Sequence, residues 1–372
     1  MLSKEHKFKD SNGFIALCRP GFEKALAQEF YRWSGQKGMA GVCRADDRNG
    51  FVVFSASMPM DDLAAEAAPS WQRLIFARQV LPWFVQVTDL PAGDRLTPIL
   101  AAVEQFPPEA VFEGIELAFP DSEAGRPLSR FCRRFEKPLT CALQERERLA
   151  PKGNPGEMLY GVFTDWSTVW LCHAPPGLAA PSASGIPRLR MPREAPSRSV
   201  LKLAEALLVL LTDKERQRFL KPGMKAVDLG AAPGGWSWQF AQYGIEVTAI
   251  DNGRIAPRVT ATGMVHPIAA DGFKWRPRRS VDWLLCDMVE QPSRIAELMA
   301  AWLARGDCRH ALFNLKLPMK KRLAAIDDAL ARLRRRMGSQ GGVELRVKHL
   351  YHDREEVTVY ARALRGARRG RR

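Results

Sequence analysis

In the second half of the chain, short apolar runs alternate with segments in which apolar residues recur every three or four positions. The short runs have the length of buried strands, and the periodic segments are typical of amphipathic helices. This alternation predicts an α/β domain whose strands form a doubly wound, parallel sheet. The predicted strands are 224–229, 246–250, 281–286, 311–315, 343–350 and 357–361, and the predicted helices are 236–243, 295–303 and 320–337.

The first half has a different order of elements and predicts two small α+β units, at 1–88 and 89–173. A basic stretch in the second unit contains Pro138, which we expect to split it into two short elements. The first unit is predicted to have strands at 13–18, 51–55 and 79–87 and helices at 22–33 and 61–68. The second is predicted to have a helix at 96–106, the basic stretch at 128–143, and strands at 114–119, 157–164 and 168–173.

Two segments lack apolar periodicity. Residues 174–196 hold six prolines among small residues, which predicts a linker before a C-terminal domain at 197–362. Residues 363–372 form a basic tail that we expect to be disordered in isolation. The second part of the linker is also basic, and its arginines either follow a phosphate backbone or are ordinary exposed charges. These arginines are Arg188, Arg190 and Arg193, with Arg198 just beyond.

Charge is distributed unevenly along the chain. The 372 residues include 56 Lys and Arg against 41 Asp and Glu, a net charge of +15. Residues 1–184 hold 20 basic and 22 acidic side chains and residues 185–372 hold 36 and 19, so the two parts carry −2 and +17. A basic half suits a polyanionic partner such as RNA, although basic residues also serve solubility alone.

Cysteine usage and hydropathy exclude several classes of protein. The seven cysteines are an odd number without a C-x-x-C pair or a Cys/His cluster, so neither a disulfide framework nor a metal site is indicated. The N-terminus lacks the apolar core of a signal peptide, and no run of about eighteen apolar residues occurs. We therefore expect a cytoplasmic protein that binds neither a membrane nor a metal.

A glycine-rich turn joins the first two predicted strands of the C-terminal domain. In the sequence 228–236, Gly230, Gly234 and Gly235 remove side chains where a ligand must touch backbone. The spacing G-x-x-x-G-G differs from the dinucleotide pattern G-x-G-x-x-G, and no phosphate-binding G-x-x-x-x-G-K-S/T run occurs. Asp251 ends the next strand, where a carboxylate can accept hydrogen bonds from ribose hydroxyls. The pattern favours a nucleoside ligand without phosphates.

This turn, Asp-Leu-Gly-Ala-Ala-Pro-Gly-Gly-Trp, resembles the S-adenosylmethionine loop of the FtsJ-like ribose 2′-O-methyltransferases. Lys202, Asp287, Lys316 and Glu356 match, by local motif and chain order, the Lys-Asp-Lys-Glu set of those enzymes. The resemblance implies that Lys316 is the base that deprotonates a ribose hydroxyl and that Asp287 positions Lys316 and the ribose. Lys202 and Glu356 would orient the hydroxyl.

A lysine base needs a lowered pKa, because its ordinary value of about 10.4 keeps it protonated. Burial, the neighbouring Lys202 and the cofactor's sulfonium are expected to lower the pKa of Lys316, while the charge of Asp287 acts in the opposite direction. We expect the lowering effects to dominate.

The same resemblance implies that S-adenosyl-L-methionine is the cofactor. Asp271 is expected on its adenine side, unless Asp271 only forms the turn before Gly272. Trp236 either packs on the adenosine or begins the helix core. The implied cofactor-binding residues are Ser199, Ala232, Pro233, Gly234, Gly235, Asp251, Asp271 and Asp287.

Several motifs across 197–360 are similar to those of the large-subunit ribosomal RNA methyltransferase M family, bacterial enzymes that methylate a cytidine ribose 2′-oxygen in 23S rRNA. One departure is Ala232, where that family is expected to have cysteine. The order of elements in the second unit, 89–173, is similar to a THUMP-type RNA-binding module, without a distinctive motif. Its basic stretch, with Arg130, Arg133, Arg134 and Lys137, either binds RNA or is a solvated charged face. The matching segments are 197–203, 251–253, 271–277, 286–290, 313–321 and 350–359.

The resemblance implies a Rossmann-like methyltransferase domain that acts, as a monomer, on 23S rRNA, either free or in an assembling large subunit. A 2′-O-methyltransferase for another RNA such as tRNA is one alternative. A non-catalytic RNA-binding assembly protein is another, although the four matched residues argue against it. The glycine spacing disfavours a nicotinamide oxidoreductase.

Overall fold

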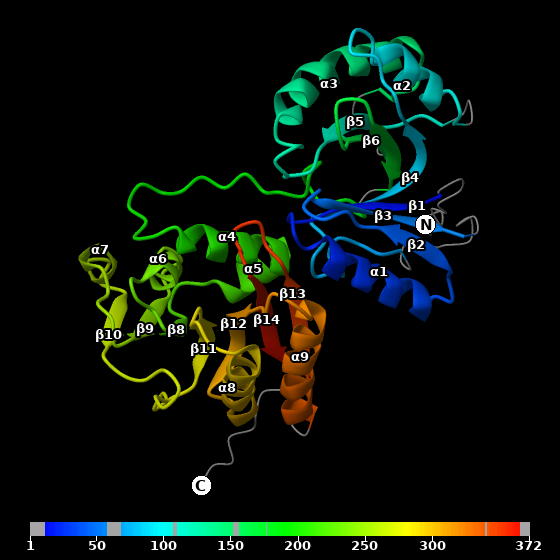
Figure 1. Ribbon diagram of the computed structural model, residues 1–372. Helices are drawn as coiled ribbons and strands as arrows, with labels where there is room; N and C mark the ends of the chain where they lie inside the picture. Colours follow the sequence, from blue (N-terminus) through cyan, green and yellow to red (C-terminus); the bar gives the residue numbers. More distant parts are fainter. Residues whose placement is uncertain are drawn as a thin grey trace, which may run out of the picture. The chain divides into compact units, whose positions relative to one another are not determined.

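The computed structural model describes residues 12–57, 68–106, 110–151, 156–175, 177–338 and 341–364. The chain divides into two compact units, Met1–Pro187 and Arg188–Arg372, and each is built on its own seven-stranded sheet (Figure 1). The helix predicted at 61–68 lies outside the described residues except for Ala68, and so does the basic tail beyond Leu364.

The sheet of the first unit has the strand order β2-β3-β1-β4-β7-β6-β5, in which only β5 and β6 are parallel neighbours. Pairing of β4 with β7 makes the sheet continuous across residue 88, where the sequence predicted a boundary. The strands are β1 (Gly13–Leu17), β2 (Gly41–Arg44), β3 (Phe51–Ala56), β4 (Gln79–Val87), β5 (Gly114–Ala118), β6 (Met158–Phe163) and β7 (Val169–Ala174), and the helices are α1 (Glu23–Gln36), α2 (Leu96–Val103) and α3 (Leu128–Glu145).

Helix α3 contradicts the predicted break at Pro138, because it continues through the proline from Leu128 to Glu145. A proline inside a helix removes one N–H donor and crowds the preceding turn. Buried apolar residues on both sides of it, including Leu128 and Leu143, hold the two halves against the core and offset that cost. The basic residues of this stretch are exposed: Arg130, Arg133, Arg134 and Lys137.

The first part of the predicted linker is bound to the first unit. The side-chain amide of Gln79 donates to the carbonyls of Ser182 and Ala183, and its carbonyl accepts the N–H of Ala180 at 2.8 Å. Leu178 is buried as well. A free tether therefore does not begin at residue 174, and the division between the two units falls after Pro187.

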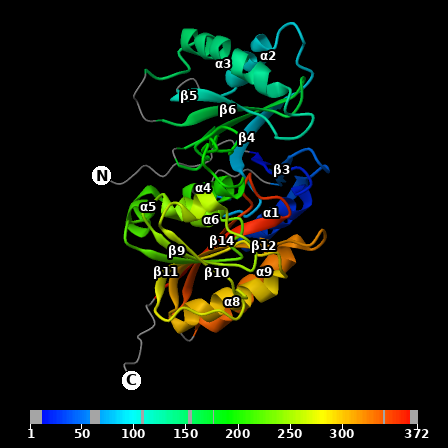
Figure 2. The same ribbon diagram turned by 90° about the vertical axis from the view of Figure 1, so that its left-hand side faces the viewer.

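The second unit confirms the predicted α/β class. Its strand order is β10-β9-β8-β11-β12-β14-β13, and α8 and α9 cover one face of the sheet while α4 and α6 cover the other (Figures 1 and 2). The strands are β8 (Lys225–Leu229), β9 (Glu246–Ile250), β10 (Val265–Ile268), β11 (Val281–Cys286), β12 (Cys308–Lys316), β13 (Val343–Lys348) and β14 (Glu356–Ala363). The helices are α4 (Ser199–Leu210), α5 (Asp213–Phe219), α6 (Gly235–Ala241), α7 (Pro257–Thr260), α8 (Pro292–Arg305) and α9 (Arg322–Gly338).

The sheet is not wholly parallel, contrary to prediction, because β14 runs antiparallel to both β12 and β13. Only residues 349–355 connect β13 to β14, and a parallel pair needs a longer crossover. The parallel strands β8 and β11 lie side by side, with β9 beyond β8 and β12 beyond β11. The loops after β8 and β11 therefore diverge, and a crevice opens at the carboxyl ends of the strands.

Candidate active site

The glycine turn after β8 brings backbone close to the crevice. Gly230 has a φ of +73°, and a Cβ there would lie 2.4 Å from the Cγ of Met288. Gly234 precedes α6 with a φ of +106°. A Cβ on Gly235 would lie 2.1 Å from the hydroxyl oxygen of Ser199, so this glycine permits α4 and the start of α6 to approach. Glycine is needed at these points for conformation and for close packing.

Asp251 fixes the turn from the end of β9. Its Oδ2 accepts the N–H of Ala232 at 2.9 Å, and its Oδ1 accepts the N–H of Gly253 at 2.6 Å. Each carboxylate oxygen has a second lone pair, so hydrogen bonds from ribose hydroxyls are still available to it. Ala232 enters this arrangement through its backbone, which explains why its methyl group can replace the side chain expected there.

A cavity of about 400 Å³ lies beside the turn. Of the predicted cofactor residues, Asp251, Asp271 and Asp287 line it, whereas Ser199 and the turn from 232 to 235 do not. Asp271 also accepts the N–H of Phe273 at 2.8 Å. It therefore stabilises the turn before Gly272 and lines the cavity as well. The remaining lining residues are Gly230, Ile250, Asn252, Ala270, Gly272, Phe273, Met288, Val289 and Glu290.

This cavity fits a nucleoside with a positively charged substituent. Carboxylates at Asp251 and Asp271 provide hydrogen-bond acceptors, and Ile250, Phe273 and Met288 provide apolar contact. Trp236 takes no part, because it is buried and its ring N–H donates to the carbonyl of Ser199 at 3.1 Å. Of the two roles open for this tryptophan, the structure shows the core role.

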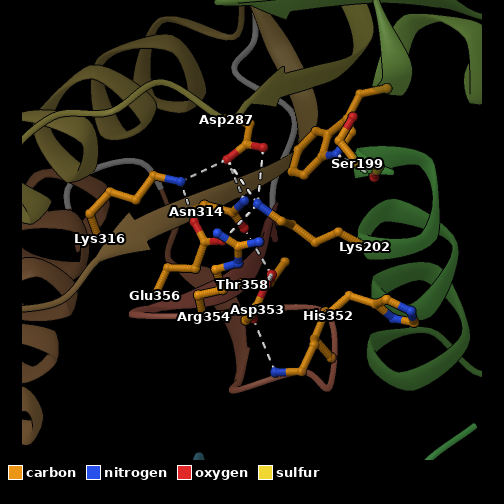
Figure 3. Close-up of polar contacts among 12 residues, drawn as sticks. Ser199, Lys202, Asp287, Asn314, Lys316, His352, Asp353, Arg354, Glu356 and Thr358 are labelled. Carbon is orange, nitrogen blue, oxygen red and sulfur yellow. Dashed lines mark hydrogen bonds and ion pairs between the residues drawn. The ribbon is translucent and has the colours of Figure 1, made fainter. Parts of the chain in front are cut away.

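Two lysines and two carboxylates meet next to the cavity and alternate in charge (Figure 3). Lys202 comes from α4, Asp287 follows β11, Lys316 ends β12 and Glu356 begins β14. The Nζ of Lys202 lies 3.0 Å from Asp287 Oδ2 and 2.7 Å from Glu356 Oε1. The Nζ of Lys316 lies 3.0 Å from Asp287 Oδ1 and also pairs with Glu356 Oε2. The structure thus brings together the four residues predicted to be catalytic, and we call them the tetrad.

The electrostatics of the tetrad contradict the lowered pKa that the sequence led us to expect for Lys316. Burial does act to lower this pKa, but the carboxylates of Asp287 and Glu356 outweigh burial, and the pKa of Lys316 is raised. Burial likewise acts to raise the pKa of Asp287, but Lys202 and Lys316 reverse the effect and the pKa is lowered. The sequence argument weighed one carboxylate against two cations and omitted Glu356.

Three polar residues behind the tetrad were not predicted. Asn314 donates to Asp287 Oδ1 at 2.7 Å, and Thr358 and Asp353 continue the hydrogen-bonded chain inward. Asn314 precedes Lys316 by two positions and Thr358 follows Glu356 by two, so each shares a strand face with a tetrad member. A polar residue in a buried strand, two positions from a catalytic candidate, is the signal that the sequence offered.

A further buried carboxylate lies in β8, below the turn. Asp228 is 2 % exposed, and the hydroxyl of Ser237 donates to its Oδ2 at 2.7 Å. Burial raises the pKa of Asp228 from 3.8 to about 7, against the effect of the Ser237 hydrogen bond. This group therefore titrates near neutral pH.

No helix among the described residues is both long and apolar enough to span a membrane. Within the same ranges, no three His, Cys, Asp or Glu side chains are grouped so that they could hold a metal ion.

Family models match three parts of the chain. They are described as the RlmM ferredoxin-like domain (residues 12–81), the N-terminal domain of ribosomal RNA large subunit methyltransferase M (94–173) and the FtsJ-like methyltransferase (195–321). Among solved structures, TrmN from Thermus thermophilus aligns with 95% of this chain and 99% of its own at 16% identity and a TM-score of 0.37, a likeness too distant to bear on function.

Curated relatives match over nearly the full length. The ribosomal RNA large subunit methyltransferase M of Aromatoleum aromaticum is 51% identical over 361 residues, which cover 96% of each chain. The protein of the same name from Azoarcus sp. is 49% identical over 350 residues, covering 94% of this chain and 95% of that one. With identity of this extent, and with the glycine turn and the tetrad in place, the chain belongs to the ribosomal RNA large subunit methyltransferase M family.

Proposed function

We propose that the protein transfers the methyl group of S-adenosylmethionine to the ribose 2′-oxygen of a cytidine in 23S rRNA. One observation carries this proposal. Asp287 lines the cavity beside Gly230 and Asp251 and also bonds Lys202 and Lys316, so the donor pocket and the tetrad share a wall. A ribose hydroxyl at the tetrad would thus be next to the donor.

The pocket residues would hold and orient the donor. Asp251 would accept hydrogen bonds from its ribose hydroxyls, Asp271 would face its adenine side, and the bare turn at Gly230 would let it approach the backbone. When bound, S-adenosylmethionine supplies an electrophilic methyl group and a positive charge on sulfur.

Lys316 would act as the general base. Its Nζ must be neutral to take the proton of the 2′-hydroxyl, and the two carboxylates hold it protonated in the protein alone. A positive charge in the adjoining pocket opposes this protonation. Lys202 helps, because it bonds Asp287 and Glu356 from the other side and reduces the negative charge that Lys316 experiences. The four side chains together then fix the position of the hydroxyl.

Methyl transfer from labelled donor to 23S rRNA, to tRNA and to RNA with a 2′-deoxy target tests this function. We expect transfer to 23S rRNA and none to the deoxy analogue. Lys316→Ala should abolish transfer with donor affinity nearly unchanged, while Lys225→Ala, an exposed lysine at the amino end of β8, should retain activity. Full activity of Lys316→Ala would refute the assignment of Lys316 as the general base. Transfer to tRNA alone would refute 23S rRNA as the substrate.

We also propose that residues 89–173 form a THUMP-like module that binds RNA through α3, and that the protein acts as a cytoplasmic monomer. Four exposed cations on one helix, Arg130, Arg133, Arg134 and Lys137, support RNA contact. Charge reversal of Arg133 and Arg134 should weaken rRNA binding without changing donor affinity. Equal rRNA binding by this variant would contradict the role of α3, and sedimentation would test the monomer.

A further inference from the structure

A chain of hydrogen bonds connects the tetrad to the interior of the second unit (Figure 3). Asn314 Nδ2 donates to Asp287 Oδ1 at 2.7 Å. The hydroxyl oxygen of Thr358 lies 2.8 Å from Asn314 Oδ1 and 3.1 and 3.2 Å from the two carboxylate oxygens of Asp353. Asn314, Thr358 and Asp353 are each 0 % exposed, so solvent does not supply alternative partners.

The number of protons in this chain fixes its direction. Asn314 turns its amide NH₂ toward Asp287, so its carbonyl oxygen can only accept, and the single hydroxyl proton of Thr358 must point to it. With that proton committed to Asn314, Thr358 accepts a hydrogen bond from Asp353 when the Asp353 carboxyl group carries a proton. Burial, followed by the charge of Glu356, raises the pKa of Asp353 well above its ordinary value, which agrees with a neutral carboxyl group.

The far end of the chain is held in place by helix α4. Glu205 is 2 % exposed and accepts the N–H of Tyr351 at 2.7 Å and the N–H of His352 at 2.9 Å. Asp353 in turn accepts the N–H of Leu350 at 3.0 Å. The segment that carries Asp353 therefore has a fixed backbone, and the same helix provides Lys202.

We propose that Asp353, Thr358 and Asn314 are positioning residues that set how much negative charge Asp287 presents to Lys316. Oδ1 of Asp287 receives Asn314 Nδ2 at 2.7 Å and Lys316 Nζ at 3.0 Å, so the amide and the ammonium share one oxygen. An N–H donated to that oxygen weakens its attraction for the ammonium proton. The relay thereby lowers the cost of deprotonating Lys316.

Other charged groups in this region act on the same oxygen or on the same lysine. They come from α4, from β8, from β13, from residues 349–355 and from β14. They are the carboxyl groups of Glu205, Asp228 and Glu356, the amines of Lys202 and Lys348, the imidazoles of His349 and His352, and the guanidinium of Arg354. A test of the relay must therefore change a neutral member and leave all of these charges in place.

Thr358→Val does so, since it removes the hydroxyl and keeps the shape of the side chain. The readout is the pKa of Lys316, followed by NMR in the full chain with ¹⁵N-labelled lysine and no cofactor, with the signal assigned through Lys316→Arg. We expect Thr358→Val to raise this pKa by about one pH unit, because Asn314 loses the hydroxyl that holds its amide in place and its own hydrogen bond to the charged Asp287 is then weakened. Thr358→Ala serves if valine prevents folding.

Three controls make the result specific. Thr358→Ser retains the hydroxyl and should keep the wild-type pKa of Lys316. Thr248→Val, the same change on β9 away from the tetrad, should also keep it. Asp353→Asn is neutral and can still donate to Thr358, so it should resemble wild type. An unchanged Lys316 pKa in folded Thr358→Val, or an equal rise in Thr358→Ser or Asp353→Asn, would overturn the relay.

The catalytic consequence rests on the proposed function and is measured separately. In single-turnover methyl transfer, Thr358→Val should move the midpoint of the pH–rate profile to higher pH, with donor affinity and KM for rRNA unchanged. A lower plateau with an unmoved midpoint would assign these residues a purely geometric role and refute the electrostatic one. Absence of transfer by the wild-type protein would refute the proposed function, whereas the NMR result would still decide the relay.

Discussion

The buried Asp228 should make the stability of the protein depend on pH, and replacing it by asparagine should remove this dependence. The free energy of unfolding of Asp228→Asn, relative to wild type, should therefore be higher at pH 8 than at pH 5. The carboxyl group ionises at about 3.8 when the chain is unfolded and at about 7 in the folded protein. Between these values the folded state binds the extra proton, so the stability contributed by this group is complete below pH 3.8 and falls as the pH rises to 7. The variant carries no charge at any pH and lacks this dependence.

The pKa values give the size of the effect. A difference of about 3 pH units, at 1.36 kcal/mol each, corresponds to about 4 kcal/mol between pH 3.8 and pH 7, and relaxation around the buried charge makes this an upper value. The side chain is 2 % exposed, so solvent screening reduces the value little. The amide of asparagine can still accept the hydrogen bond from Ser237.

Urea unfolding of the full chain at pH 5 and pH 8 gives the free energy of unfolding of variant and wild type, and the effect is the difference between these two free energies at each pH. Because about two of those pH units lie between pH 5 and pH 7, we expect the stability of Asp228→Asn relative to wild type to rise by up to about 3 kcal/mol on going from pH 5 to pH 8. Asp282→Asn on the neighbouring β11, where the carboxylate is only partly buried, controls for general changes in net charge. A difference for Asp228→Asn that is the same at both pH values would refute the raised pKa and the reasoning from burial.

Three further predictions concern the turn, the substrate side and the first unit. Gly230→Ala should weaken donor binding about tenfold or more in calorimetry, because its methyl group would displace Met288 from the pocket wall. Gly263→Ala, with a φ of +70° but open space around it, shows the cost of backbone strain alone, and an equal loss there would contradict the steric argument. Arg354→Ala should raise the KM for rRNA and reduce the salt dependence of binding, because this exposed guanidinium stands two positions before Glu356 of the tetrad. Arg309→Ala, an exposed arginine at the start of β12, at the end of that strand away from Lys316, should do neither; equal effects of the two substitutions would refute a role for Arg354 in RNA binding. Pro138→Ala should stabilise the first unit by about 1 to 3 kcal/mol in urea unfolding, because α3 regains one N–H donor, and a loss of stability would show that the proline ring packs favourably.

The sequence predicted the elements near the site well, because their signals are local. Apolar runs ending in Leu229, Ile250 and Cys286 mark strands, and the residues that follow such strands gather at one edge of the sheet. That rule, together with motif order, is sufficient to place Asp251, Asp287 and Lys316 at the same edge of the sheet. Glu356 joined them from an antiparallel strand, which the alternation of strands and helices did not reveal.

What the sequence could not provide was the balance among long-range contacts. The pKa of Lys316 depends on two carboxylates that lie 29 and 40 positions away in the chain, and local pattern does not give their distances. Helix α3 continues through Pro138 because burial of its apolar residues, such as Leu128 and Leu143, outweighs the cost of a proline inside a helix. Likewise, Gln79 holds residues 180–183 through contacts across about a hundred positions.

The pairing of β4 with β7 limits how the N-terminal half can be dissected. The segment matched to the ferredoxin-like model ends at residue 81, inside β4, and β4 continues to Val87 along the strand that closes the other segment. Separating the two matched segments, 12–81 and 94–173, would leave the backbone N–H and C=O groups of β7 that face β4 without the strand they pair with. Unpaired strand edges of this kind form hydrogen bonds with other chains. Expression trials of either piece should therefore yield aggregates, whereas a fragment that ends after Pro187 leaves the ladder whole.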